Sequence, residues 1–387
     1  MGLFSFSKKP ARSVALIDIG SASVGGAYAH FVEGQQPVIY YTARVDIEPR
    51  EGEPITDSML RALSFLERLM IEEGAPALRR ETRDAHIDEV LVSIAAPWQE
   101  TRVITTHIQE RKPFTFSRAH LDAADRAAGI PKDRERSGRT IIATILNGYE
   151  TPNPFGKRAT RADLIMLSSS IEKDAARLIE LSLRRAFHTH DITLTAFAPV
   201  GYTVFRDLYP HQKDFVILDV SGSGTDMAFV KRGLLADTRT VPFGIHDLLR
   251  AATVAGQRAH LNDSALIDPA ANASFAKEEE AIRRLWLSGL EEAFAAFAKA
   301  QALPRTVFLL ADQSVREYLK RLLEGSDLRA LWLTNDPLCV VALTPASLAT
   351  RVKTRGLGEG DLFLALLALY AARTAGITPP EDIPTAS

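Results

Sequence analysis

The stretch that decides the fold is Val14-Ala15-Leu16-Ile17-Asp18-Ile19-Gly20, and its pattern returns as Phe215-Val216-Ile217-Leu218-Asp219-Val220-Ser221-Gly222. In both places an apolar run ends in Asp and enters a turn of small residues, which predicts a buried β-strand followed by a tight loop. Two further strand-like runs follow each copy, at 27–32 and 38–45 and at 227–230 and 238–241. An interval of about 200 residues is too long for a solenoid repeat and predicts a duplicated domain.

The rest of the chain predicts helices and strands in alternation around these two meanders. In the first half we expect a helix at 57–73 and a strand at 90–94, and between the halves a compact α+β insert with a helix from Ser117, strands at 140–149, 163–169 and 192–197, and a helix at 171–187. In the second half we expect helices at 244–255, 275–300, 314–323 and 361–372, with strands at 306–310 and near Leu331. The predicted class is α/β, a duplicated fold with an α+β insert.

Composition excludes several classes of protein. The 387 residues carry 46 Lys and Arg against 48 Asp and Glu, a net charge of -2, so the basic excess of a nucleic-acid-binding protein is missing. Cys339 is the only cysteine, which excludes an internal disulfide and is typical of a reducing cytoplasm. No apolar run approaches the roughly 20 residues that cross a bilayer, and we expect no direct transmembrane segment.

The two loops have the composition of phosphate-binding turns. Small residues let backbone N–H groups approach phosphate oxygens, and an Asp at the strand end can hold Mg²⁺. Two copies at the same place in two repeated meanders are what a nucleotide held by a duplicated domain requires. The alternative is a pair of ordinary β-hairpins whose turns happen to be rich in Ser and Gly.

These residues resemble the actin-like ATPase superfamily (ribonuclease H-like fold), and within it the FtsA and PilM type. Residues 145–149 and 153–158 with the strand 163–169 look like the 1C (SHS2) module of that type, and Val241-Pro242-Phe243-Gly244-Ile245 looks like the turn after its second phosphate hairpin. The resemblance implies a tail at 1–12, subdomain IA at 13–112, the 1C insert at 113–198, subdomains IIA and IIB with a closing IA helix at 199–376, and a disordered tail at 377–387.

The resemblance also implies ATP and Mg²⁺ as ligands. Asp18 and Asp219 would organise Mg²⁺ and the attacking water, and the small residues of both loops would surround the phosphates: Gly20, Ser21, Ala22, Ser23, Gly222, Ser223, Gly224 and Thr225. The adenosine side would involve Glu279 and Arg283, and Ala311 and Asp312 in a segment that contains no glycine. For Glu279 and Arg283 the alternative is a solvated acidic first turn of a helix. For the activity itself, we expect slow ATP hydrolysis at most.

By the same resemblance the protein would be cytoplasmic, at the inner face of the cell membrane. It would serve as an adaptor or filament former that binds membrane-associated division or pilus proteins, with cell division the first expectation and pilus assembly the second. A nucleotide-free scaffold is a further alternative. The run Lys157-Arg158-Ala159-Thr160-Arg161 stands apart, because three positive charges in five residues could receive an acidic partner or form a solvated loop.

Overall fold

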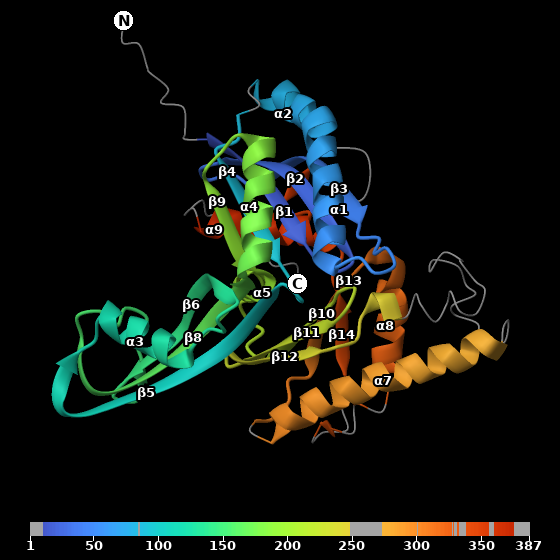
Figure 1. Ribbon diagram of the computed structural model, residues 1–387. Coiled ribbons are helices and arrows are strands. Elements are labelled where there is room, and N and C mark those ends of the chain that lie inside the picture. The colour runs from blue at the N-terminus through green and yellow to red at the C-terminus, as the bar shows by residue number, and fades with distance from the viewer. Residues whose placement is uncertain are drawn as a thin grey trace, which may run out of the picture. The chain divides into compact units, whose positions relative to one another are not determined.

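The computed structural model describes residues 11–83, 86–247, 273–299, 301–326, 328, 331–332, 338–355 and 360–374. The chain divides into two units: unit 1 comprises Met1–Ile94, Asp174–Thr195 and Thr344–Ser387, and unit 2 comprises Ala95–Lys173 and Ala196–Leu343. The predicted tails lie outside the described residues, except that the first strand already begins at Ala11, inside the segment 1–12 expected to be a tail. Figure 1 shows the elements of both units in sequence colours.

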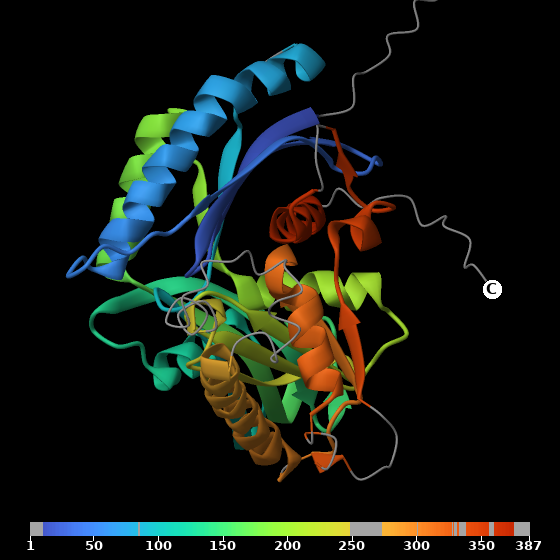
Figure 2. The same cartoon turned by 90° about the vertical axis from the view of Figure 1, so that its right-hand side faces the viewer.

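Unit 1 is built on a six-stranded sheet with the order β15-β3-β2-β1-β4-β9. Its elements are β1 (Ala11–Ile19), β2 (Ser23–Val32), β3 (Val38–Asp46), α1 (Ile55–Leu69), the π-helix Met70–Gly74, α2 (Ala75–Thr82), β4 (Glu89–Ile94), α4 (Lys173–Phe187), β9 (Ile192–Ala196), the 3-10 helix Pro345–Leu348, β15 (Lys353–Thr354) and α9 (Leu362–Thr374). The first three strands form an antiparallel meander, and β4 joins β1 in parallel. Helices α1 and α4 cover one face of this sheet, and α9 covers the other (Figure 2).

The helix α1 lies against the sheet because its apolar residues recur at helical spacing. Met59, Leu63 and Leu66 are fully buried. Close packing requires a glycine in the strand beneath, since a Cβ at Gly26 would stand 2.4 Å from the sulfur of Met70. The predicted helix at 57–73 is thus confirmed as α1 with a following π-turn.

Unit 2 contains a five-stranded sheet with the order β12-β11-β10-β13-β14. Its elements are α5 (Phe197–Leu208), β10 (Phe215–Val220), β11 (Thr225–Lys231), β12 (Leu234–Val241), α7 (Ala273–Ala298), β13 (Thr306–Ala311), α8 (Gln313–Glu324) and β14 (Cys339–Ala342). One face buries Trp286, Leu290 and Phe294 of α7. The other face meets α5 through Phe205, whose ring centroid lies 4.9 Å from that of Phe308.

The two sheets repeat one plan. In each, an antiparallel three-stranded meander is extended by parallel pairing of its first strand, β1 with β4 and β10 with β13. The predicted duplication is therefore confirmed by the topology of the two sheets.

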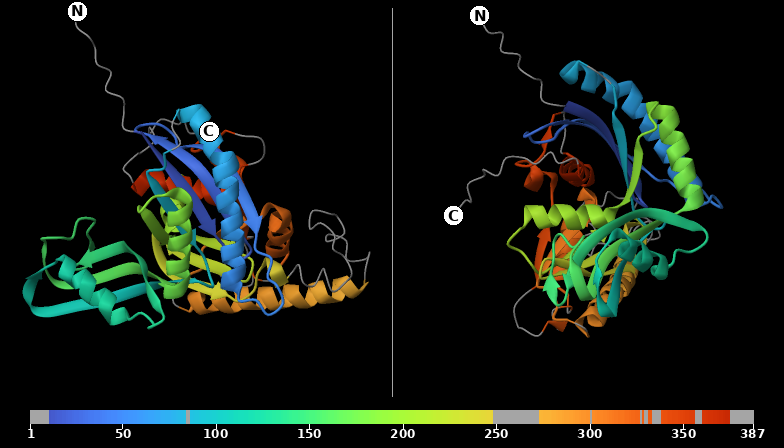
Figure 3. Two further views of the ribbon diagram at one scale, coloured as in Figure 1. Left: turned by 45° about the horizontal axis from the view of Figure 1, so that its top comes forward. Right: turned by 90° about the vertical axis from the view of Figure 1, so that its left-hand side faces the viewer.

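The insert forms its own four-stranded sheet within unit 2, with the order β5-β8-β6-β7. It comprises β5 (Gln99–Thr115), α3 (Arg118–Ala128), β6 (Arg134–Leu146), β7 (Tyr149–Glu150) and β8 (Arg158–Glu172). Figure 3 shows this sheet from two sides. Its core includes Phe116, Leu164 and Met166, and the hydroxyl of Thr238 in β12 donates to the carbonyl of Thr101 in β5 over 3.2 Å.

The insert boundaries differ from the predicted 113–198. Strand β5 pairs with β8 from Gln99 onward, so the insert sheet already begins at Gln99. At the other end, β9 belongs to the sheet of unit 1, and α4 packs there through an edge contact between the rings of Phe187 and Tyr28. The predicted strand near Leu331 is wrong, because that residue is in a helical turn and the strand lies at Cys339–Ala342. Most of the helix predicted at 244–255 lies outside the described residues.

Candidate functional site: two phosphate-type loops

The two predicted loops have the same turn. In unit 1 the N–H of Gly20 donates to the carbonyl of Ser23 over 3.0 Å, and in unit 2 the N–H of Ser221 donates to the carbonyl of Gly224 over 2.9 Å. Each turn begins two residues after the Asp of the preceding strand, at Gly20 after Asp18 and at Ser221 after Asp219. Residues 20–23 therefore correspond to residues 221–224, and Ser221 takes the place that Gly20 has in the first loop.

In unit 1 the carboxylate of Asp18 is held by an arginine. Nη2 of Arg44, on β3, lies 2.9 Å from Oδ2 of Asp18, and Nε of Arg44 lies 2.6 Å from Oδ2 of Asp361, just before α9. Nη1 of Arg44 donates to the hydroxyl of Ser23 over 2.9 Å. One guanidinium thus connects the end of β1, the first loop and the start of α9.

A glycine makes room for this arginine. Gly25 of β2 is the register partner of Arg44, and a Cβ at Gly25 would stand 2.5 Å from Nη2 of Arg44. Any side chain at position 25 would occupy the space through which the guanidinium reaches Asp18. Asp18, Gly25 and Arg44 therefore form one row across the strands β1, β2 and β3.

Burial and pairing shift the pKa values of these groups in different directions. Burial raises the pKa of Asp18, although Arg44 opposes the shift, and the neighbouring Asp361 adds to it. Burial works against ionisation of Asp361 as well, but the charge and hydrogen bonds of Arg44 hold its pKa below the usual value. Arg44 donates two hydrogen bonds to Asp361, from Nε over 2.6 Å and from Nη2 over 3.1 Å, and one to Asp18 over 2.9 Å, so Asp361 is its stronger partner.

The loop of unit 2 is fixed from its other side by the turn at residues 243–245. A Cβ at Gly244 would stand 2.4 Å from the carbonyl oxygen of Ser221, so this position requires glycine for close backbone approach. The N–H of Ile245 donates to the same carbonyl over 2.9 Å. The hydroxyl of Thr225 donates to the carbonyl of Phe243 over 2.8 Å and accepts from the indole N–H of Trp286 over 2.9 Å.

The row that corresponds to Asp18, Gly25 and Arg44 carries different charges in unit 2. Asp219 pairs in register with Asp226, and Asp226 pairs with Thr240. The hydroxyl of Thr240 donates to the carboxylate of Asp226 over 2.5 Å. Burial raises the pKa of Asp226, and the Thr240 hydrogen bond offsets part of that shift. Two carboxyl groups on adjacent strands replace the carboxylate–guanidinium pair of unit 1.

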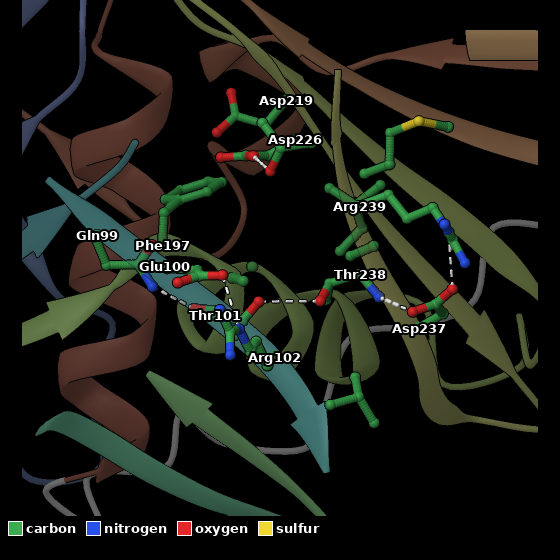
Figure 4. A pocket seen from close by; sticks show the side chains of 17 residues that line it. Gln99, Glu100, Thr101, Arg102, Phe197, Asp219, Asp226, Asp237, Thr238 and Arg239 are labelled. Carbon is green, nitrogen blue, oxygen red and sulfur yellow. Dashed lines mark hydrogen bonds and ion pairs between the residues drawn. The ribbon is translucent and has the colours of Figure 1, made fainter. Parts of the chain in front are cut away.

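These two carboxyl groups line a cavity of about 490 Å³ within unit 2. Figure 4 shows them at one end of the cavity, with Phe197 beside them and the first residues of β5 opposite. The other charged side chains of the lining pair locally: Arg102 lies 2.7 Å from Glu100, and Arg239 lies 3.0 Å from Asp237. The volume falls within the range of about 300–1,000 Å³ that is typical of small-molecule sites.

Of the residues expected on the adenosine side, Ala311 lies next to the second loop, because it is the register partner of Val220 at the end of β10. Arg283 pairs with Glu280 on its own helix α7, which is the arrangement of a solvated helix turn, and the side chain of Glu279 lies outside the described residues. Ala311 ends β13 and is buried, while Asp312 is exposed and accepts from the N–H of Arg316 through its carbonyl, at the start of α8.

The donor sets of the two loops differ in their fit to Mg²⁺, which prefers carboxylate and phosphate oxygens. Asp219 and Asp226 present such oxygens side by side and fit the ion. Asp18 does not fit it in this arrangement, because the guanidinium of Arg44 already holds its carboxylate. Within the described part of the chain, no three His, Cys, Asp or Glu side chains are placed to share a metal ion.

Sequence reasoning missed Arg44, Asp361 and Asp226. The signal for Asp226 was present, because it follows the second loop directly and its register partner is fixed by the hairpin. Gly25 gave a weaker signal, a glycine inside a strand that indicates close approach of another group. Nothing in the local sequence links Asp361 to residues more than 300 positions earlier.

Comparison with known structures shows that the chain has the duplicated actin-like fold. A chain of the PilM–PilN type IV pilus biogenesis complex is similar over 94% of this chain and 98% of that one, with a TM-score of 0.60 and 16% sequence identity. A Bacteroides thetaiotaomicron protein described as having an actin-like ATPase fold and unknown function is similar over 95% and 98%, with a TM-score of 0.42 and 11% identity. No protein-family model matches the chain, and no curated protein matches it in sequence.

Proposed function

We propose that this chain is an actin-fold ATP-binding protein that serves as an adaptor for a membrane-associated machine of the type IV pilus kind. The observation that carries the proposal is the similarity to a chain of the PilM–PilN complex, which extends over nearly the full length of both chains, insert included. The cell-division role that the sequence favoured has no comparable support, and we place it behind the pilus role.

For the nucleotide we propose unequal roles for the two loops. The loop of unit 2 would supply Gly222, Ser223, Gly224 and Thr225 near the phosphates, with Asp219 and Asp226 as ligands of Mg²⁺. The ion, when bound, would neutralise phosphate charge. The loop of unit 1 would contribute Gly20, Ser21, Ala22 and Ser23 without a metal at Asp18. Hydrolysis would be slow at most, because Arg44 already holds the carboxylate of Asp18, one of the two carboxylates expected to organise the metal.

A nucleotide-free scaffold is the second candidate. Two observations favour it: Arg44 holds the carboxylate of Asp18, and the segment from Ala311 to Gln313 contains no glycine where a backbone could approach adenine closely. In this case the cavity beside Asp219 would hold no nucleotide.

For partners, we propose a membrane-associated pilus protein as the main one, with self-assembly as a further possibility. Among the described residues, no helix is both long and apolar enough to span a membrane. Attachment through a partner at the cytoplasmic face of the cell membrane fits this finding. Nucleic acid remains outside the proposal, since the net charge is -2.

Removal of the protein from its source cells tests the adaptor role. We expect loss of surface pili in electron micrographs with normal cell length, and recovery on expression of the wild-type chain. Long undivided cells with normal pili would contradict the pilus role and support cell division. Recovery by an Asp219→Asn variant as complete as by wild type would support the scaffold over the nucleotide-dependent adaptor.

A further inference from the structure

The free end of the insert carries a cluster of cations from three separate segments. We define the basic tip as Arg111 and Lys112 in β5, Arg118 at the start of α3, Lys157 directly before β8, and Arg158 as its first residue. The β5–β8 ladder is interrupted between Gln109 and Phe114, so the residues around Arg111 bulge out of it. All five side chains are exposed.

Backbone contacts hold the three segments together. The N–H of Phe116 donates to the carbonyl of Lys157, and the N–H of Gly156 donates to the carbonyl of Phe116, both over 2.9 Å. Arg158 pairs in register with Thr115. The cations therefore gather by the fold and not only by their order in the sequence.

The five cations have few anions around them. Among the described residues none of the five forms an ion pair, although the charge of Arg118 helps to lower the pKa of Asp122 one turn further along α3. The neighbouring Arg161, in contrast, lies 3.0 Å from Asp163 and is neutralised there. The only acidic residue within the segments 109–118 and 155–158 is Glu110. A local excess of positive charge in a chain of net charge -2 indicates a surface for an anionic partner.

Two exposed aromatic side chains accompany the basic tip. Phe155 is 48% exposed, in the turn before Lys157, and Tyr149 is 78% exposed on β7. The β6–β7 turn is tied to β8 nearby, because Oδ1 of Asn147 accepts from the N–H groups of Thr160 and Arg161. An anionic bilayer surface offers negative headgroups for the cations and an interfacial layer for aromatic rings, whereas an acidic peptide would use the cations alone.

We infer that the basic tip of the insert binds the surface of membranes that contain anionic phospholipids, with Phe155 and Tyr149 at the headgroup layer. This contact goes beyond the proposed function, which requires a protein partner but no lipid. It gives the insert a direct contact with the bilayer, in addition to any contact with a partner.

Vesicle sedimentation of the full chain tests the inference. We expect binding to phosphatidylcholine vesicles that contain phosphatidylglycerol, weak binding to pure phosphatidylcholine, and loss at high salt. Each basic residue near an anionic surface contributes about a fivefold factor, so Lys157→Glu with Arg158→Glu should reduce the partition constant by about 25-fold or more. The matched control is Arg79→Glu with Arg80→Glu, an equal charge change at exposed positions on α2.

A second variant separates lipid from an acidic protein partner. Phe155→Ala keeps every charge, and we expect it to weaken vesicle binding while leaving binding to polyglutamate unchanged. Equal loss in the α2 control, or binding to polyglutamate without binding to anionic vesicles, would overturn the inference. Thermal unfolding of each variant verifies the fold, and ATP binding by the same variants reports on the proposed function separately.

Discussion

The guanidinium of Arg44 lies 2.9 Å from the carboxylate of Asp18, at the point where the duplicated fold places Thr240 on the other sheet. This one relationship separates the two loops chemically. In unit 1 the carboxylate is neutralised from within the protein, and in unit 2 the corresponding Asp219 stands beside a second carboxyl group. The two loops therefore have the same turn but different charges beside it. The first already has a cation of the protein next to its carboxylate, whereas the second has another carboxyl group there, which an external cation could neutralise.

Loss of Arg44 should destabilise unit 1. Arg44→Ala leaves the carboxylates of Asp18 and Asp361 buried without their shared partner, and breaking such a pair costs about 3–5 kcal/mol. The measurement is the free energy of unfolding in denaturant. Arg355→Ala is the control, since its ion pair with Glu81 is exposed and contributes about 1 kcal/mol or less. Equal effects of the two substitutions would show that Arg44 has no special role.

The two partners of Arg44 should respond differently to pH. The pKa of Asp361 is lowered on folding, so its ionised form stabilises the protein above the unfolded value of about 3.9, and this contribution is lost as pH falls through the folded pKa. The pKa of Asp18 is raised, so its contribution is present at low pH and lost as pH rises. At pH 7 we expect Asp361→Asn to lower Tm more than Asp18→Asn.

That difference in Tm should shrink as pH falls below the unfolded aspartate value of about 3.9 and toward the lowered pKa of folded Asp361, where its carboxylate becomes protonated. Asn at position 361 can still accept the hydrogen bond from the N–H of Leu364, so the helix cap of α9 is retained. What is removed is the charge, together with the hydrogen bond that Oδ2 accepts from Nε of Arg44. A larger effect of Asp18→Asn at pH 7 would contradict the assignment of Asp361 as the stronger partner.

The role of Gly25 is tested by a double-mutant cycle. Gly25→Ala should displace Arg44 and cost about 1–3 kcal/mol in the free energy of unfolding, because the new Cβ would stand 2.5 Å from Nη2. In an Arg44→Ala background the same substitution should cost much less. Gly138→Ala, where a Cβ meets nothing within 4 Å, is the control. Additive effects of the Gly25 and Arg44 substitutions would show that the two residues act independently.

The second loop should be sensitive to Gly244. A Cβ there would stand 2.4 Å from one backbone carbonyl oxygen and 2.5 Å from another, and backbone cannot rotate away as a side chain does. We expect Gly244→Ala to shift the loop, and so to weaken ATP binding at least tenfold while Gly138→Ala leaves it unchanged. The measurement is titration of both variants with ATP. Unchanged affinity in Gly244→Ala would show that this turn is not part of the nucleotide site.

Much of the fold was predictable because it follows from local patterns. Apolar runs that end in Asp and small residues located β1 and β10, and their repetition predicted the duplicated sheet. The insert boundary at Gln99 was not predictable in the same way, because β5 alternates weakly and its pairing with β8 is a contact between distant segments. For the same reason α4 and β9 were assigned to the insert although they pack in unit 1.

The candidate site was predictable only as far as its loops. Asp18 and Asp219 are equivalent by sequence pattern, and their environments differ because of residues on neighbouring strands. Arg44 lies 26 residues after Asp18, and Asp361 lies 317 residues after Arg44. Their meeting depends on strand register and on the packing of α9, which no periodicity in the sequence encodes.

Titration with a fluorescent ATP analogue and Mg²⁺ tests the central claim most directly, that the chain binds nucleotide chiefly through the loop of unit 2. The account predicts saturable binding that Asp219→Asn weakens at least tenfold and Asp18→Asn changes much less. Asp174→Asn, which removes one charge at a side chain 92% exposed, should leave the affinity unchanged. Absence of saturable binding, or a larger loss in Asp18→Asn than in Asp219→Asn, would contradict the account.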